Sequence, residues 1–307
     1  MKRQAYGRDV GLSLRMTLTM FLLGLLYVGF ALVLFYALHT SLVVLVLIVV
    51  GLAFFQYYTS DKLALKAAGA RVVTPEEAPQ LHATVERLAA MANIQKPRVA
   101  IIDSDIPNAF ATGRNQKHSV VAVYRGLLDR LDENEVEGVL AHELTHIVNR
   151  DVLVMTLAST FAMLAALITR FGLYAGFFGG FGGGNNRDNN NGVPVWLVIV
   201  VVAFVTYIVS WVLIRTISRY REYAADRGSA VITGAPEYLM SALQKITGQM
   251  AVIPQKDLRE VQALNAFFII PARFKGSISE LFMDHPPLEK RLAALEKIAQ
   301  EMGRPVS

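Results

Sequence analysis

The sequence predicts an α+β protein that is mostly helical, crosses a membrane four times and carries a cytoplasmic part with a small β-sheet. Three observations lead to this prediction. The 307 residues have a mean hydropathy of +0.39 and are 53% hydrophobic, more than a soluble domain usually carries. Charged residues make up only 18%, and their absence is concentrated in long apolar runs. Charged segments separate these apolar runs, and one of the charged segments contains short stretches rich in β-branched residues.

The N-terminal residues, 1–58, are predicted to form a transmembrane hairpin. Met16 to Ser60 contains no Asp, Glu, Lys or Arg over 45 residues. This is about twice the length that one helix needs to cross a bilayer, and too long for a signal peptide. We divide the run near His39, which gives the spans Met16–Leu38 and Leu42–Tyr58.

A second hairpin is predicted over residues 152–217. Val152–Thr169 holds 18 uncharged residues and Val193–Ile214 holds 22, each near the length of a membrane helix. The Thr, Ser and Ala content of the first run also suits a buried helix of a soluble core, so that alternative stays open. The stretch between them, Gly172 to Gly192, is rich in Gly and Asn and is expected to be a flexible extracytoplasmic loop.

The basic residues predict the topology. They precede the first span and follow the second and the fourth, whereas the loop between the third and fourth spans holds only Arg170 and Arg187. By the positive-inside rule, both termini and the soluble blocks lie in the cytoplasm. This topology and an anionic lipid bilayer account for the net charge of +5, with no nucleic-acid partner. The absence of Cys excludes disulfides and thiolate metal ligands.

Two soluble parts of one cytoplasmic domain are predicted, residues 59–151 and 218–307. In the first, Thr74-Pro75-Glu76-Glu77 predicts the start of a helix that ends at Met91. Three segments suit strands: Arg98–Ile102, Asn108–Thr112 and Ser119–Tyr124. The second part is predicted to be mostly helical, most clearly over Pro236–Thr247 and Pro286–Gln300.

The pattern H-E-x-x-H stands at residues 142–146, inside a helix-forming run from Glu133 to Asp151. Positions i and i+4 share a helix face, so His142 and His146 can present two imidazole nitrogens to one metal ion. Glu143 can then reach a water on that metal and act as general base. The pattern predicts a zinc site, the alternative being a solvated helix with two incidental histidines.

Glu222 is the candidate third metal ligand, because a catalytic zinc usually has three protein ligands. It lies just beyond the fourth predicted span, and Asp226 follows it at i+4 on the same helix face. If spans three and four form a hairpin, His146 and Glu222 emerge at the same end of it. Asp226 would then orient a ligating histidine. A surface acid pair beside neighbouring arginines is the alternative interpretation.

The chain resembles the HtpX family of membrane metallopeptidases, peptidase family M48. The resemblance rests on HELTHIVNRD (residues 142–151), REYAAD (221–226), NAFATG (108–113) and DHPPLEKR (284–291), together with the four-span layout, and covers nearly the full chain. It implies a zincin-like domain of the gluzincin type, with one zinc on His142, His146 and Glu222, Glu143 as general base and acid, and Asp226 as partner of His142.

The resemblance also implies two further roles. Asn108, Ala109 and Phe110 would lie at an edge strand that pairs with the substrate backbone. An ordinary turn that opens a strand explains the same residues. His285 would stabilise the oxyanion of the tetrahedral intermediate, although it can equally serve as a cap before Pro286.

The expected function is zinc-dependent endopeptidase action at the cytoplasmic face of a bacterial inner membrane. The resemblance implies that its polypeptide substrates are misfolded membrane proteins and nearby cytosolic chains, cleaved in quality control under stress. A non-catalytic membrane scaffold or transport component is the main alternative. The predicted spans contain hydroxyl residues but no acid or base, which counts against transport. The related prenyl-protein peptidases generally have more spans than this chain.

Overall fold

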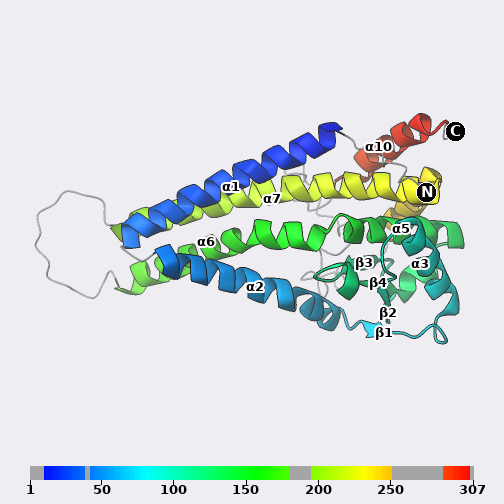
Figure 1. Ribbon diagram of the computed structural model, residues 1–307, viewed down its shortest axis with the longest axis horizontal. Helices are drawn as coiled ribbons and strands as arrows, with labels where there is room; N and C mark the ends of the chain where they lie inside the picture. The colour runs from blue at the N-terminus through cyan, green and yellow to red at the C-terminus, as the bar shows by residue number, and fades with distance from the viewer. Residues whose placement is uncertain (1–9, 39–41, 180–194, 251–285, 305–307) are drawn as a thin grey trace, which may run out of the picture. The chain divides into compact units, whose positions relative to one another are not determined.

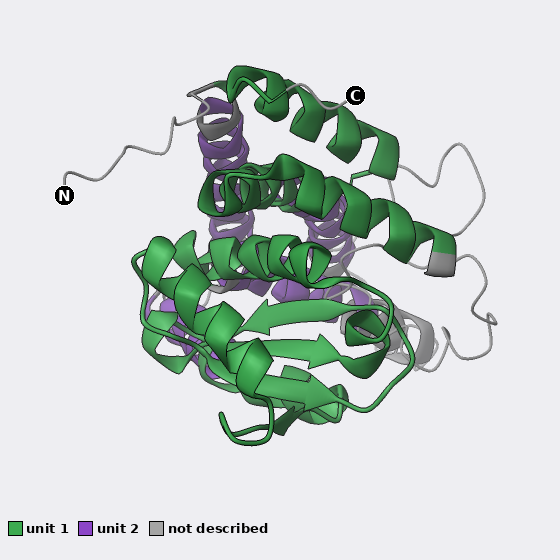
Figure 2. Ribbon diagram, turned by 90° about the vertical axis from the view of Figure 1, so that its right-hand side faces the viewer, with its two compact units in different colours: residues 1–13, 57–154, 218–307 green, residues 14–56, 155–217 purple. Residues whose placement is uncertain are grey.

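The computed structural model describes residues 10–38, 42–179, 195–250 and 286–304. Contacts between residues divide the chain into two compact units, which Figure 2 distinguishes by colour. The first unit contains Tyr57–Val154 and Ser218–Ser307 with the first 13 residues, and the second contains Leu14–Gln56 and Met155–Ile217. In the part of the chain that the structure describes, four long helices contribute to both units: α1 Val10–Leu38, α2 Leu42–Ala67, α6 Asp151–Gly179 and α7 Val195–Thr233.

The first unit contains a mixed four-stranded sheet in the order β1-β2-β4-β3. Strands β2 and β4 are parallel, and the outer strands β1 and β3 run antiparallel to their neighbours. Every residue of β4 is buried, as expected for a central strand rich in valine. The sequence correctly predicts three of the four strands to within one residue. Their bounds are β1 Arg71–Val72, β2 Arg98–Ile102, β3 Ala109–Thr112 and β4 Val120–Tyr124.

Helices cover this sheet and extend its core. Helix α5 packs against β3, α3 packs against β2 and α5, α8 packs on α5, and α10 packs on α8 (Figure 1). Their buried faces and the sheet form one hydrophobic cluster, in which Val85, Leu140 and Leu243 are fully buried. The helices are α3 Pro79–Met91, α4 Arg125–Leu128, α5 Glu133–Val148, α8 Pro236–Met250 and α10 Leu288–Glu301, with a 3₁₀ turn at Gln116–His118.

Helix α3 starts later than the sequence predicts. The prediction placed its start at Thr74-Pro75, but residues 75–77 form a turn and the helix begins at Pro79. A residue before proline is disfavoured in the helical region, and Ala78 has φ −143° and ψ 64°. Glu77 accepts a hydrogen bond from the amide of Thr74 at 2.8 Å, which closes the turn. The second proline, rather than the first, therefore begins the helix, and Met91 ends it as predicted.

The H-E-x-x-H helix is also interrupted where the sequence predicts continuity. Helix α5 ends at Val148 and α6 begins at Asp151, with Asn149 and Arg150 between them. Arg150 has φ 57°, in the left-handed region that glycine usually occupies at a helix C-terminus. The predicted run from Glu133 to Asp151 is thus interrupted between α5 and α6.

The second unit, over its described residues, consists of parts of four long apolar helices. These are α1 Val10–Leu38, α2 Leu42–Ala67, α6 Asp151–Gly179 and α7 Val195–Thr233. Among the described residues, three stretches are long and apolar enough to cross a membrane: Leu14–Tyr36, Leu153–Arg170 and Leu197–Thr233. The apolar part of α2, Val46–Thr59, is shorter. Tyr27 donates a hydrogen bond to the carbonyl of Ala158, and Gln56 donates to Ser159 at 2.7 Å. Polar pairs of this kind hold membrane helices together.

Gly138 lets α5 and α8 approach closely, and its replacement should destabilise the first unit. A Cβ at this position would lie 2.7 Å from the backbone nitrogen of Leu239. Gly138→Ala is therefore expected to lower the free energy of unfolding by about 1–3 kcal/mol, although alanine is the better helix former. Urea unfolding in detergent measures this change.

Gly248 in α8 is the matched control, because no atom of the described residues lies within 4 Å of a Cβ there. Gly248→Ala should be neutral or stabilising by up to about 1 kcal/mol. Equal effects of the two substitutions would show that the close approach of the helices at Gly138 is unimportant.

Candidate metal centre

Helix α5 is fixed at its N-terminus by a reciprocal cap. Asp132 accepts from the amide of Glu135 at 3.0 Å, and Glu135 accepts from the amide of Asp132 at 3.0 Å. Glu135 is buried and also accepts from Ser241 at 2.5 Å, and Lys245 lies 2.6 Å from the same carboxylate. These contacts attach the start of α5 to α8. The middle of α5, which carries the H-E-x-x-H residues, is consequently held within the core.

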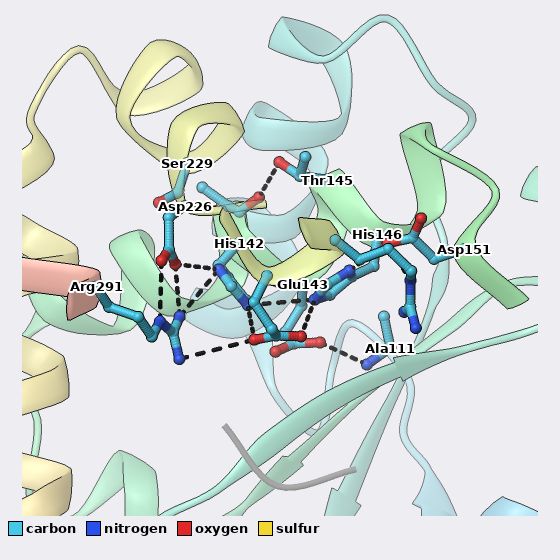
Figure 3. A network of polar contacts seen from close by, with 12 residues as sticks. Ala111, His142, Glu143, Thr145, His146, Asp151, Asp226, Ser229 and Arg291 are labelled. Carbon is cyan, nitrogen blue, oxygen red and sulfur yellow. Dashed lines mark hydrogen bonds and ion pairs between the residues drawn. The ribbon is translucent and has the colours of Figure 1, made fainter. Parts of the chain in front are cut away.

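Helix α7 lies close against α5 and brings a second set of polar side chains to it. A Cβ at Gly228 would meet the Thr145 hydroxyl at 2.4 Å, so only glycine allows this approach. Ser229 donates to the carbonyl of Gly138 at 2.7 Å. As Figure 3 shows, Asp226 of α7 faces His142 of α5.

The side chains of His142, His146 and Glu222 converge on one point. Their potential ligand atoms all lie within 4.8 Å of one another. The two Nε2 atoms are 3.2 Å apart, and each lies 3.5 Å from an oxygen of Glu222. A tetrahedral ion with bonds of about 2.0–2.1 Å separates its ligand atoms by about 3.3 Å. The donor set and its spacing therefore fit a zinc ion.

The opposite nitrogen of each imidazole contacts a buried carboxylate. Nδ1 of His142 lies 3.0 Å from Asp226, and Nδ1 of His146 lies 2.5 Å from Asp151. A carboxylate that accepts the Nδ1 proton fixes the tautomer and leaves the Nε2 lone pair available to a metal. The sequence predicted the contact of Asp226 with His142, but assigned no role to Asp151.

Glu143 is 4% exposed and lies beside His142 and His146, as Figure 3 shows. Its Oε2 accepts a hydrogen bond from the amide of Ala111 in β3 at 2.8 Å. Burial raises the pKa of Glu143 above its ordinary value, although the neighbouring histidines oppose this effect. A carboxyl group with a raised pKa is well suited to accept and return a proton near neutral pH.

Arg291 is the main residue that the sequence analysis missed. It is 1% exposed and holds Asp226 through two hydrogen bonds, from Nε at 2.9 Å and from an Nη atom at 2.5 Å. Its other Nη atom is 3.7 Å from Glu222. The sequence carries a signal for this position, because Arg291 stands three residues after Leu288 and four before the buried Leu295. It therefore occupies the inward stripe of α10.

The charges of this cluster favour a divalent cation. Glu143, Glu222 and Asp226 are buried acids, and Arg291 supplies one positive charge beside them. With the three acids ionised, the formal charge of these four residues is −2. A dication would neutralise it, and charges this deeply buried are stable only when they are compensated.

The remaining predicted site residues fall in two places. Asn108, at 1% exposure, directly precedes β3, and the buried Ala109 and Phe110 belong to this strand, which stands at one end of the sheet order. His285 lies outside the described residues.

Comparison with known proteins places the chain in a family. A model of peptidase family M48 matches residues 75–299. The Protease HtpX homolog of Moorella thermoacetica is 54% identical over 302 residues, 98% of each chain. The Protease HtpX homolog 2 of Methanosarcina mazei is 50% identical over 304 residues, which are 99% of this chain and 100% of that protein. The chain belongs to peptidase family M48. It is an HtpX-type membrane metalloprotease, as the sequence predicted.

A solved structure shares the fold. The crystal structure of Ste24p from S. mikatae matches with a TM-score of 0.55 and 19% sequence identity, covering 94% of this chain and 67% of that one. In this M48 chain, the structure confirms the prediction of a mostly helical α+β fold with a small β-sheet and several long apolar helices.

Removing Arg291 should destabilise the protein strongly, because Asp226 would keep a buried charge without its partner. Arg291→Met is expected to lower the free energy of unfolding by about 3–5 kcal/mol. Arg291→Lys, which keeps the charge but not the paired hydrogen bonds, should lose less. Arg304→Met is the control, since Arg304 is 57% exposed where it pairs with Glu237. Thermal unfolding distinguishes the variants, and equal losses for Arg291→Met and Arg304→Met would contradict the assignment.

Metal binding should release a proton from His142. Burial lowers the pKa of His142, but hydrogen bonds to Asp226 and Glu222 outweigh it and raise the pKa from 6.5 to about 9. The proton therefore stabilises the metal-free protein below pH 6.5, and this stabilisation is lost as the pH rises through about 9. A metal ion that binds Nε2 of His142 must displace this proton. The apparent affinity of the protein for the metal should therefore rise about tenfold per pH unit up to pH 9. Calorimetry in buffers of different ionisation enthalpy counts the protons, and zinc binding at pH 7 without proton release would contradict this account.

Proposed function

We propose that this chain is an endopeptidase that holds one zinc ion on His142, His146 and Glu222 and hydrolyses peptide bonds within polypeptides. The observation that supports this proposal is the convergence of two Nε2 atoms and a carboxylate at spacings suited to a tetrahedral ion. Asp226 would orient His142 by accepting its Nδ1 proton.

Glu143 would move the protons of the reaction. Bound zinc supplies a Lewis acid that polarises the scissile carbonyl and makes water acidic enough to react near neutral pH. Glu143 takes a proton from the attacking water and then gives it to the nitrogen of the departing amine. The water oxygen forms the new bond to the carbonyl carbon, and the C–N bond breaks. The amide of Ala111 holds the Glu143 carboxylate in place for both transfers.

Substrate backbone would bind along β3, with Asn108, Ala109 and Phe110 as the contact segment. The backbone amide of Tyr124 donates to the carbonyl of Asn108 at 3.0 Å. The backbone hydrogen bonds to β4 are therefore made by Asn108 and by every second residue after it in β3. In an antiparallel ladder the alternate residues, Ala109 and Ala111, direct their backbone groups away from β4. An extended peptide added there would run past Glu143, which Ala111 contacts. We further propose that His285 stabilises the oxyanion.

The proposed location is the cytoplasmic membrane, with four spans and with both termini and the active site on the cytoplasmic side. Three apolar stretches support it, and α2 would supply the remaining span although its apolar part is shorter. The placement of the basic residues supports the orientation. An anchored peptidase of this kind suits misfolded membrane proteins and nearby unfolded chains as substrates, in quality control under stress.

Glu143→Gln is the decisive test, because glutamine keeps the shape of glutamate but cannot accept a proton. Cleavage of a fluorescently labelled unfolded polypeptide in detergent should fall about 10²–10⁴-fold, with one zinc retained per chain by atomic emission. Glu133→Gln, an exposed change in the first turn of the same helix, should leave both measurements unchanged. Cleavage that survives in Glu143→Gln would refute the proposed base and favour a non-catalytic role for the motif. A wild-type protein that binds no zinc would refute the metal site.

A further inference from the structure

We propose that Asp151 and Arg221 position His146, so that the second ligand histidine has an orienting pair of its own. This inference rests on the proposed function, because it takes His146 as a metal ligand. Asp151 is 1% exposed, and its Oδ2 lies 2.5 Å from Nδ1 of His146. Nε of Arg221 lies 3.1 Å from the same oxygen. The contact directs Nε2 of His146 toward Glu222 and His142.

The break between α5 and α6 makes this contact geometrically feasible. In a continuous helix, residues five apart are rotated by about 140° around the axis, so Asp151 would face away from His146. The left-handed backbone of Arg150, at φ 57°, changes the direction of the chain between them. Such a backbone is energetically unfavourable for a residue that has a Cβ atom. The cost is offset where Asp151 becomes the first residue of α6 and reaches the imidazole.

Arg221 supplies a positive charge beside the buried carboxylate of Asp151. A buried carboxylate is stable only beside a partner of opposite charge, and this pairing holds Asp151 where it contacts His146. Arg221 also directly precedes Glu222 in α7. One short segment of α7 thus supplies the third proposed ligand and the counter-charge for the residue that orients the second.

Each histidine contacts a carboxylate that an arginine accompanies, although Arg291 makes two hydrogen bonds to its carboxylate and Arg221 forms an ion pair. His142 contacts Asp226, which is paired with Arg291 of α10. His146 contacts Asp151, which is paired with Arg221 of α7. The Nδ1 atom of each histidine contacts a carboxylate that is paired with an arginine. The two Nε2 atoms lie 3.2 Å from each other. The charges of Asp151 and Arg221 cancel, so this pair does not change the balance that a dication would satisfy.

The test is zinc affinity, measured by competition with a chromophoric chelator in the purified full-length protein. Asp151→Ala should bind zinc about 10–100-fold more weakly than the wild type. Asp132→Ala is the matched control: Asp132 caps the N-terminus of the same helix, so its loss destabilises α5 without touching His146. It should lower the melting temperature and leave zinc affinity unchanged. If Asp151→Ala binds zinc as tightly as the wild type, or if Asp132→Ala weakens binding equally, the positioning role is refuted.

A second experiment asks whether Arg221 acts through Asp151. Arg221→Gln should weaken zinc binding in the same direction, and the double variant should be no weaker than Asp151→Ala alone, because the two residues form one unit. Additive losses would refute the pairing. With cobalt(II) in the site, Asp151→Ala should also shift the visible absorption bands, a change that lost stability alone does not cause. A wild type that binds neither metal would instead overturn the proposed function.

Discussion

Compensation of buried charge is the constraint on which the rest of this structure depends. Five ionisable side chains of this centre are each at most 4% exposed: His142, Glu143, Glu222, Asp226 and Arg291. Such a group is stable only beside a partner of opposite charge or a metal ion. The packing follows from this requirement. Glycines let the helices approach closely enough for the partners to meet, and α10 brings its arginine into the interior.

The sequence indicates the candidate ligands His142, His146 and Glu222 more readily than the residues that surround them. His142 and His146 are linked by helix periodicity, and Glu222 with Asp226 by the same rule, so local spacing alone indicates both pairs. Arg291 and Asp151 contact the histidines through the tertiary fold. Arg291 lies 149 residues from His142, and Asp151 reaches His146 only because the helix breaks. No local pattern requires Arg150 to adopt a left-handed backbone.

The accuracy of the predicted bounds also differs between the strands and the helices. The strand Arg98–Ile102 was predicted with its correct bounds, because a β-branched run bounded by proline and acids is a local signal. The start of α3 was wrong, because two prolines in the segment each fit the first turn of a helix. Which proline begins the helix depends on Glu77, whose side chain closes the preceding turn. The predicted start of α3 was therefore wrong because two nearby prolines give the same local signal, and not because the signal is weak.

The position of Arg291 along the chain has a consequence for biosynthesis. It follows Asp226 by 65 residues and His142 by 149, so the ribosome makes every proposed ligand before it makes this cation. Until α10 has emerged and docked, the acids of the centre repel one another without their guanidinium. A nascent chain consequently carries an incomplete centre through most of its translation.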